Sequence, residues 1–143
     1  MNTLRASCSA LLLGAALAAQ NPAAATPYGT GCLGLTLTSD LPQFGSIWNL
    51  TTTGFVPGTL ILIGFSTVPA SVPLPFPWAV GCTLLIGPAT PFLIPAPAPP
   101  AVFSLGVPND PMLKGAVFYV QSFGLATLPP WSASNGIMAT IGT

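Results

Sequence analysis

The sequence predicts a single all-β domain, an antiparallel β-sandwich or jelly-roll-like barrel, behind a cleaved signal peptide. The 15 glycines and 18 prolines are spread over the 143 residues, so few stretches long enough for a stable helix lack a helix breaker. The stretches between them are short apolar or alternating runs of the length that strands have. Several such runs separated by turn signals are typical of a sandwich or a small barrel.

Residues 1–19 have the composition of a secretory signal peptide. A basic start that ends at Arg5 is followed by a short apolar stretch at residues 8–17 and by small residues up to Ala19. The apolar stretch is too short to span a bilayer, so we expect cleavage rather than a membrane anchor. Cleavage removes both Arg5 and Cys8. The chain that remains has three charged residues, which are Asp40, Asp110 and Lys114.

Residues 20–27 show no hydrophobic period, and we expect an extended leader ahead of a β domain at residues 28–143. Such a leader has two interpretations. It adds as a strand to a neighbouring copy of the protein, or it is a disordered terminus.

Strand-like runs follow one another through residues 28–143. Residues 33–38 alternate between leucine and small or polar residues, which is typical of a half-buried strand. Residues 59–65 are apolar on both faces, so we expect a central strand that is covered on both sides. Further strands are expected at residues 46–55, 82–86, 101–107, 116–123 and 137–141, with a short one at residues 92–94.

Two proline-rich stretches and one helical turn separate these strands. Residues 69–77 and 88–100 are predicted to be extended, polyproline-like loops, because proline cannot donate to a β-ladder. They are interpreted as rigid connectors, with a functional loop as the alternative. Residues 109–114 predict a single helical turn, in which Asn109 or Asp110 caps and Pro111 occupies the first helical position.

The composition excludes most functional classes. Charged residues make up 3% of the chain, mean hydropathy is +0.76 and histidine is missing. The chain therefore lacks the cations that neutralise nucleic-acid phosphates, the commonest general base and the commonest metal ligand. Asp40 and Asp110 both lie in turn sequences, where Asx turns and caps explain them without catalysis. We expect no enzyme activity, no cofactor, no metal and no nucleic-acid partner.

Two cysteines remain after cleavage, Cys32 and Cys82. An even pair in an exported protein predicts a disulfide, and the alternative is two buried free thiols.

Attached sugar is one explanation for the solubility of a nearly uncharged surface. Asn49 opens the sequon Asn49-Leu50-Thr51, within a strand that buries Trp48 on the opposite face. Thr26 and Thr90 lie beside prolines and are candidate O-linked sites.

The order of several short motifs resembles a known family. These are Tyr28-Gly29-Thr30-Gly31-Cys32, residues 107–115 (VPNDPMLKG), Phe118-Tyr119-Val120-Gln121 and Ile141-Gly142-Thr143. Together they look like the β-rich domain of unknown function that is common in secreted proteins of planctomycete-type bacteria. This resemblance implies export and a disulfide-bearing β domain, and it implies no activity and no catalytic residues.

We consider two functional hypotheses. The first is a secreted structural subunit that associates with itself in an extracellular filament or at the cell surface, because few charges protect its strand edges. Its core would contain Trp48, Phe65, Tyr119 and residues 60–63, and its partner would be another copy of itself.

The second hypothesis is a carbohydrate-binding module for extracellular or cell-surface glycans. Trp78 and Trp131 lie in loops or beside prolines, where their rings could stack on sugars. The alternative is that each tryptophan anchors a loop against the sandwich.

Overall fold

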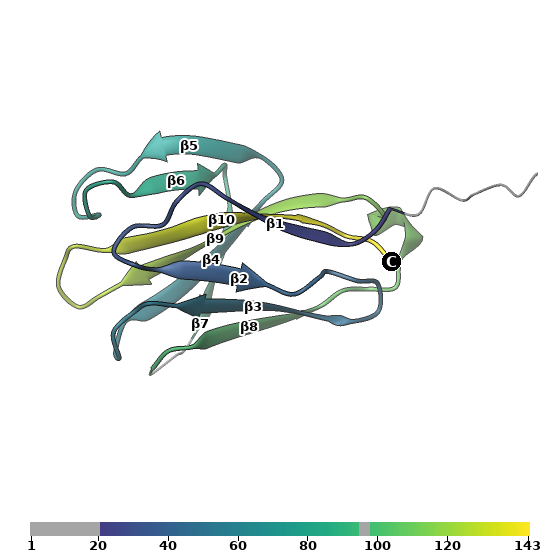
Figure 1. The fold of residues 1–143 in the computed structure, drawn as a ribbon, viewed down its shortest axis with the longest axis horizontal. Coiled ribbons are helices and arrows are strands. Elements are labelled where there is room, and N and C mark those ends of the chain that lie inside the picture. Colours follow the sequence, from purple (N-terminus) through teal and green to yellow (C-terminus); the bar gives the residue numbers. More distant parts are fainter. Residues whose placement is uncertain (1–20, 95–97) are drawn as a thin grey trace, which may run out of the picture.

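The computed structural model describes residues 21–94 and 98–143, which form a β-sandwich (Figure 1). The expected signal peptide at residues 1–19 lies outside the described residues. The elements are β1 (Ala24–Tyr28), β2 (Thr36–Ser39), β3 (Ile47–Thr53), β4 (Leu60–Ser66), β5 (Pro69–Pro73), β6 (Thr83–Ile86), β7 (Thr90–Ile94), β8 (Ala101–Gly106), the 3-10 turn η1 (Pro111–Leu113), β9 (Val117–Leu125) and β10 (Ser132–Thr140).

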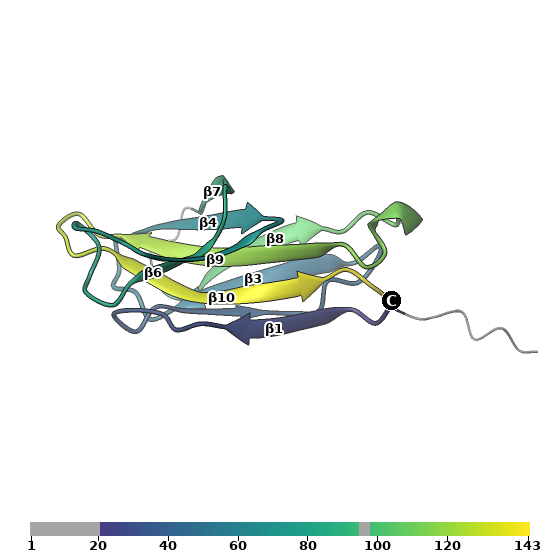
Figure 2. The ribbon, with the colours of Figure 1, turned by 90° about the horizontal axis from the view of Figure 1, so that it is seen from above.

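The strands form three layers, and all of their pairings are antiparallel. The central layer is a five-stranded sheet with the order β1-β10-β9-β4-β7. A three-stranded sheet, β2-β3-β8, packs on one face of it. The β5–β6 hairpin lies on the other face, where β6 contacts β9 and β10. Figure 2 shows β6 in front of the central sheet, with β3 and β8 behind it.

The main core lies between the two larger sheets, because alternate residues of each strand point inward. Trp48 and Leu50 of β3 face Ile61 and Ile63 of β4, and all four side chains are buried. The strand at 59–65 is covered on its inner face, whereas the hairpin covers only part of its outer face, where Gly64 and Ser66 are buried and Leu62 is half-buried. The expected core differs at Leu60, which is exposed, and at Tyr119, which is half-buried on the outer face of β9.

The leader expected at residues 20–27 contributes a strand to its own domain. β1 pairs with β10 of the same chain over five residues, from Ala24 opposite Thr140 to Tyr28 opposite Gly136. The Thr143 N–H donates to the Asn21 carbonyl and the Ala23 N–H donates to the Thr143 carbonyl, which holds the start of β1 beside the carboxyl terminus. The backbone groups on one side of this edge strand are already paired with β10 of the same chain. Donation to a neighbour would therefore require the strand to leave this ladder.

The two proline-rich stretches are also partly strands. This differs from the loop expected at residues 69–77, whereas β7 confirms the short strand expected at residues 92–94 and begins two residues earlier. β5 begins at Pro69, and β7 pairs Pro91 with Gly64 of β4. Both strands lie at the edge of their sheet, where every second residue turns its backbone away from the partner and a missing N–H costs nothing. The rule that proline is excluded from β-ladders therefore applies to the inner strands and not to these edge strands.

A side chain closes one edge of the sandwich. The strand β10 contains a bulge between Ala133 and Gly136, which turns Asn135 toward β2. The Oδ1 atom of Asn135 accepts from the Leu37 N–H at 2.9 Å, and its Nδ2 donates to the Leu37 carbonyl at 3.0 Å. Asn135 therefore replaces a strand neighbour for β2. The opposite edges, β7 and β8, have no such bridge in the described residues.

The sandwich has two different ends. The terminal end contains both ends of the described chain, the β2–β3 loop and the segment between β8 and β9 with η1 (Figure 1). The distal end contains the loops at residues 29–35, 54–59, 74–82 and 126–131. In the described part of the chain, no helix is long and apolar enough to cross a membrane.

Candidate functional site

The carboxylates of the described chain have structural roles. Asp110 caps η1, because its Oδ1 accepts from the Met112 N–H at 2.9 Å, as the turn sequence predicted. Asp40 accepts from the Asn49 side chain at 3.0 Å at the start of the β2–β3 loop. Within the described residues, no group of three or more metal-ligating side chains comes together.

The two tryptophans chosen from the sequence lie side by side. The ring centroids of Trp78 and Trp131 are 5.6 Å apart at an interplanar angle of 78°, and Phe123 lies 5.6 Å from Trp78. Backbone bonds join the two segments, from the Ala79 N–H to the Trp131 carbonyl and from the Trp131 N–H to the Pro77 carbonyl. The expectation of loop anchors agrees with this arrangement.

Trp78 and Trp131 also line a shallow surface hollow of about 300 Å³. Its other lining residues are apolar: Leu62, Leu74, Leu84, Pro91, Phe123 and Leu125. The indole N–H of Trp131 already donates to the Ala126 carbonyl at 3.2 Å. Within the part of the chain that the structure describes, the hollow offers rings for stacking but none of the polar side chains that usually orient sugar hydroxyls.

The candidate glycosylation residues lie in three different strands. Thr26 on β1 and Thr90 at the start of β7 are exposed. Asn49 is half-buried, and its amide group is engaged at both atoms, since its Oδ1 accepts from the Ser104 hydroxyl at 2.7 Å. Modification of Asn49 would break these contacts. The two threonines are free of that restriction.

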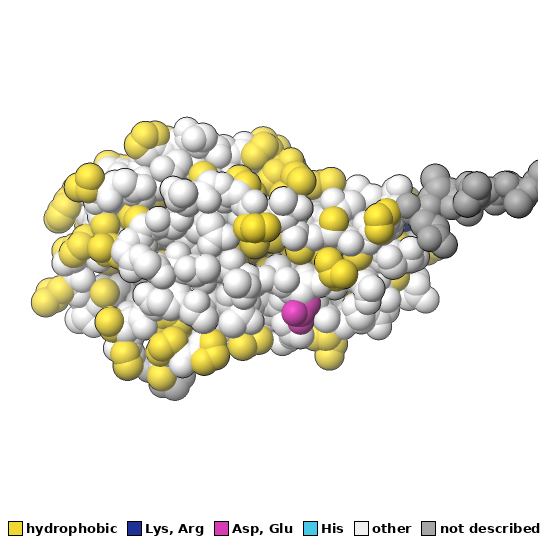
Figure 3. All heavy atoms as spheres, viewed as in Figure 1, with side chains coloured by type: hydrophobic (Ala, Val, Ile, Leu, Met, Phe, Trp, Pro, Cys, Tyr) yellow, Lys and Arg dark blue, Asp and Glu magenta, His cyan; other side chains and the backbone are white. Residues whose placement is uncertain are grey.

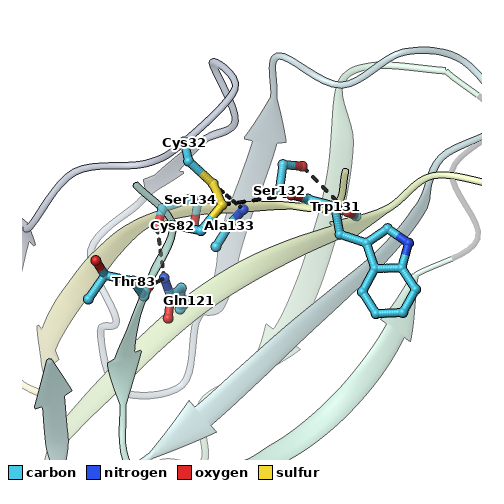
Figure 4. Close-up of a disulfide and its surroundings, with 9 residues drawn as sticks. Cys32, Cys82, Thr83, Gln121, Trp131, Ser132, Ala133 and Ser134 are labelled. Carbon is cyan, nitrogen blue, oxygen red and sulfur yellow. Dashed lines mark hydrogen bonds between the residues drawn. A yellow bond between two sulfur atoms is a disulfide. The ribbon is translucent and has the colours of Figure 1, made fainter. Parts of the chain in front are cut away.

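A disulfide and a buried glutamine hold the hairpin on the central sheet (Figure 4). Cys32 and Cys82 are bonded to each other, as their number predicted, and both are buried. A disulfide is compatible with an extracellular location. It joins the distal loop at residues 29–35 to the loop at residues 74–82.

Gln121 on β9 is completely buried below the hairpin. Its Oε1 accepts from the Leu85 N–H at 2.8 Å, and its Nε2 donates to the carbonyls of Thr83 and Ser134 at 2.8 and 2.9 Å. One side chain thus forms hydrogen bonds with backbone groups of both β6 and β10. Nothing in the sequence around Gln121 distinguished it from a surface residue.

Tyr28 gives the hairpin a second contact. Its hydroxyl donates to the Leu85 carbonyl at 2.7 Å, and its ring lies edge-on to Tyr119 at 5.9 Å. Burial, with a smaller contribution from Tyr119, raises the pKa of Tyr28 from 10.0 to about 12.

An apolar recess opens between the two sheets at the terminal end, beside the edge strands β7 and β8. We define it by Trp48, Phe65, Phe92, Leu105, Leu113 and Phe118, which come from both sheets and η1. It has a volume of about 440 Å³, and among the described residues that line it Thr90 has the only polar side chain. The rims are formed by Phe92 and Leu105, which are 40% and 39% exposed. Sequence reasoning missed this recess, because its residues meet only after six elements pack.

The distal end carries exposed apolar side chains at its loop tips. We define the apolar tip as Leu33, Val56, Phe76, Val80 and Leu128. Among them, Phe76 is 83% and Leu128 is 77% exposed. Figure 3 shows hydrophobic side chains gathered over this end, whereas the acidic side chain in view lies in the other half of the molecule. Exposed apolar side chains are not confined to this end, since Met112, Ile47 and Leu41 near the terminal end are 90%, 66% and 50% exposed.

Comparison with known proteins identifies no relative. A scan against protein-family models and searches of curated proteins and of solved structures returned no match to this chain. The resemblance to the planctomycete-type β domain therefore stays a prediction.

Proposed function

We propose that the protein is a secreted structural subunit that associates with itself in an extracellular filament or at the cell surface. One observation carries the proposal. Large apolar side chains that stay exposed in the single chain far outnumber its three described charged residues, Asp40, Asp110 and Lys114. Exposed apolar patches of this kind mark protein interaction surfaces when they are contiguous.

The strand edges support the same proposal. Soluble β proteins protect exposed edges with charged residues, covering segments or side-chain caps. β2 has its cap in Asn135, but β7 and β8 carry no charged residue and have a strand partner on one side only in the described chain. Because β1 pairs within its own chain, we place the contacts between copies on side chains rather than on a donated strand.

Electron microscopy of the native exported protein, prepared without denaturation, tests this function. The proposal predicts regular fibres or sheets. An absence of any assembly in the microscope, together with a monomeric mass in solution, would contradict it.

The paired tryptophans favour a second candidate, which is carbohydrate binding. Trp78 and Trp131 present aromatic surface to one hollow, and rings of this kind stack on sugars. A glycan-binding screen with Trp131→Ala as the test variant and Trp48→Phe as a core control would examine it. Retention of binding by Trp131→Ala, or no binding by the unmodified protein, would rule the candidate out.

A further inference from the structure

The apolar tip and the apolar recess lie at opposite ends of the molecule. The tip consists of loop side chains at the distal end, and the recess is lined by the ends of β4 and β8 and the starts of β7 and β9 near the termini. One feature projects and the other is hollow. A single chain therefore carries both halves of a possible contact, which two identical copies would bring together.

The recess has the size and chemistry for side chains from another protein. Its volume of about 440 Å³ falls within the range of about 300–1,000 Å³ that is typical of ligand pockets. The walls are aromatic, with the centroids of Trp48 and Phe65 at 5.9 Å and of Phe65 and Phe92 at 5.5 Å. Such walls recognise apolar side chains, and they contribute most when water is fully excluded.

The tip is held in shape before any contact is made. The disulfide joins the loop of Leu33 to the loop of Phe76 and Val80. The backbone bonds at Ala79 and Trp131 join that loop to the one that carries Leu128. Val56 and Leu128 line one small hollow, so their loops also adjoin. A preformed surface loses little conformational entropy on binding, which favours association through these loops.

The charge distribution disfavours a contact between two terminal ends. All three charged residues of the described chain, Asp40, Asp110 and Lys114, belong to the terminal end. Two terminal ends in contact would face each other with the same net negative charge. The tip, in contrast, carries no charge of its own, and it lacks the Lys and Arg with which peripheral proteins bind anionic lipid.

We propose that the apolar tip of one copy occupies the apolar recess of the next, an inference that rests on the proposed self-association and specifies its geometry. The contact is heterologous, because it joins two different patches. Each added copy leaves a free tip at one end and a free recess at the other. A heterologous contact that does not close into a ring continues as a filament.

Two charge-introducing variants and one control test this geometry. Leu128→Asp alters the tip, and Leu105→Asp alters the recess at a rim residue that is already partly exposed. Leu93→Asp is the matched control, because Leu93 is 58% exposed on β7 and belongs to neither patch. The wild-type protein and Leu93→Asp should assemble, and each of the other variants should remain a monomer by light scattering.

Mixing the two monomeric variants gives the decisive readout. Leu128→Asp retains an intact recess, and Leu105→Asp retains an intact tip. An equimolar mixture should therefore form a dimer and stop there, because every remaining free patch carries a substitution. Formation of the dimer also shows that both variants are folded.

Several outcomes would overturn the proposal, and they are distinguishable. Assembly by both variants alone would place the contact elsewhere while the proposed function stands. Monomers of Leu128→Asp with dimers of Leu105→Asp, and no mixed dimer, would indicate a symmetric contact between two tips. A monomeric wild-type protein that binds phosphatidylcholine vesicles through Leu128 would replace both proposals with a lipid surface.

Discussion

Replacement of Gln121 by leucine tests whether one buried amide group holds the hairpin on the central sheet. Leucine has a similar volume, so the change removes hydrogen bonds without opening a large cavity. The Leu85 N–H and the carbonyls of Thr83 and Ser134 would lose the side-chain partners that they now have at 2.8, 2.8 and 2.9 Å.

The cost follows from the number of groups left without a partner. A buried polar group that loses its hydrogen bond costs about 1–3 kcal/mol. At the low end, the three groups together give a loss of about 3 kcal/mol in the free energy of unfolding. For a domain of this size, such a loss lowers Tm by roughly 10 °C.

Thermal unfolding of Gln121→Leu measures this effect, with Gln43→Leu as the matched control. Gln43 is exposed, and its side chain makes no hydrogen bond within the described structure, so the control should melt close to the wild type. Hydrogen exchange adds a local readout, because the Leu85 amide should lose protection in Gln121→Leu. Equal Tm values for the two variants, with the Leu85 amide still protected, would refute the role assigned to Gln121.

Three further predictions concern the disulfide, a tyrosine and two glycines. Conversion of Cys32 and Cys82 to serine removes a cross-link across a sequence separation of 50, and it should lower unfolding free energy in urea by about 4 kcal/mol; an unchanged midpoint would contradict this. Because burial raises the pKa of Tyr28 to about 12, its contribution to stability is complete below the unfolded value of 10.0 and is lost as pH rises through about 12. Between pH 10 and about 12, the urea midpoint of Tyr28→Phe should therefore fall less than that of the wild type. Parallel plots of midpoint against pH for the two proteins would show that Tyr28 is not responsible for the loss. Gly54→Ala should cost about 1–3 kcal/mol more than Gly58→Ala, since both have left-handed φ (83° and 84°) but only at Gly54 would a Cβ meet the backbone of another loop. Similar losses would argue against that close approach.

The fold class could be predicted because it depends on local signals. The distribution of glycine and proline excluded long helices, and alternation correctly placed Trp48 in the core with Asn49 on the opposite face. The Asp110 cap and the disulfide were also predictable, since a cap is a local motif and a pair of cysteines leaves one intrachain pairing.

The remaining features depend on contacts between distant residues. Gln121 has its role only because the β5–β6 hairpin lies over β9, and Asn135 only because a bulge in β10 turns it toward β2. Edge position decides whether proline is tolerated in a strand, and the sequence does not indicate which strands are edges. The sequence singled out Trp78 and Trp131 as two separate residues, but it did not predict that they line one apolar hollow.

Self-association is the central proposal, and size-exclusion chromatography with light scattering on the protein, purified without denaturation, tests it most directly. The mass should exceed that of one chain and should rise with protein concentration, because apolar contacts between copies follow mass action. A single monomeric mass at every concentration would contradict the claim.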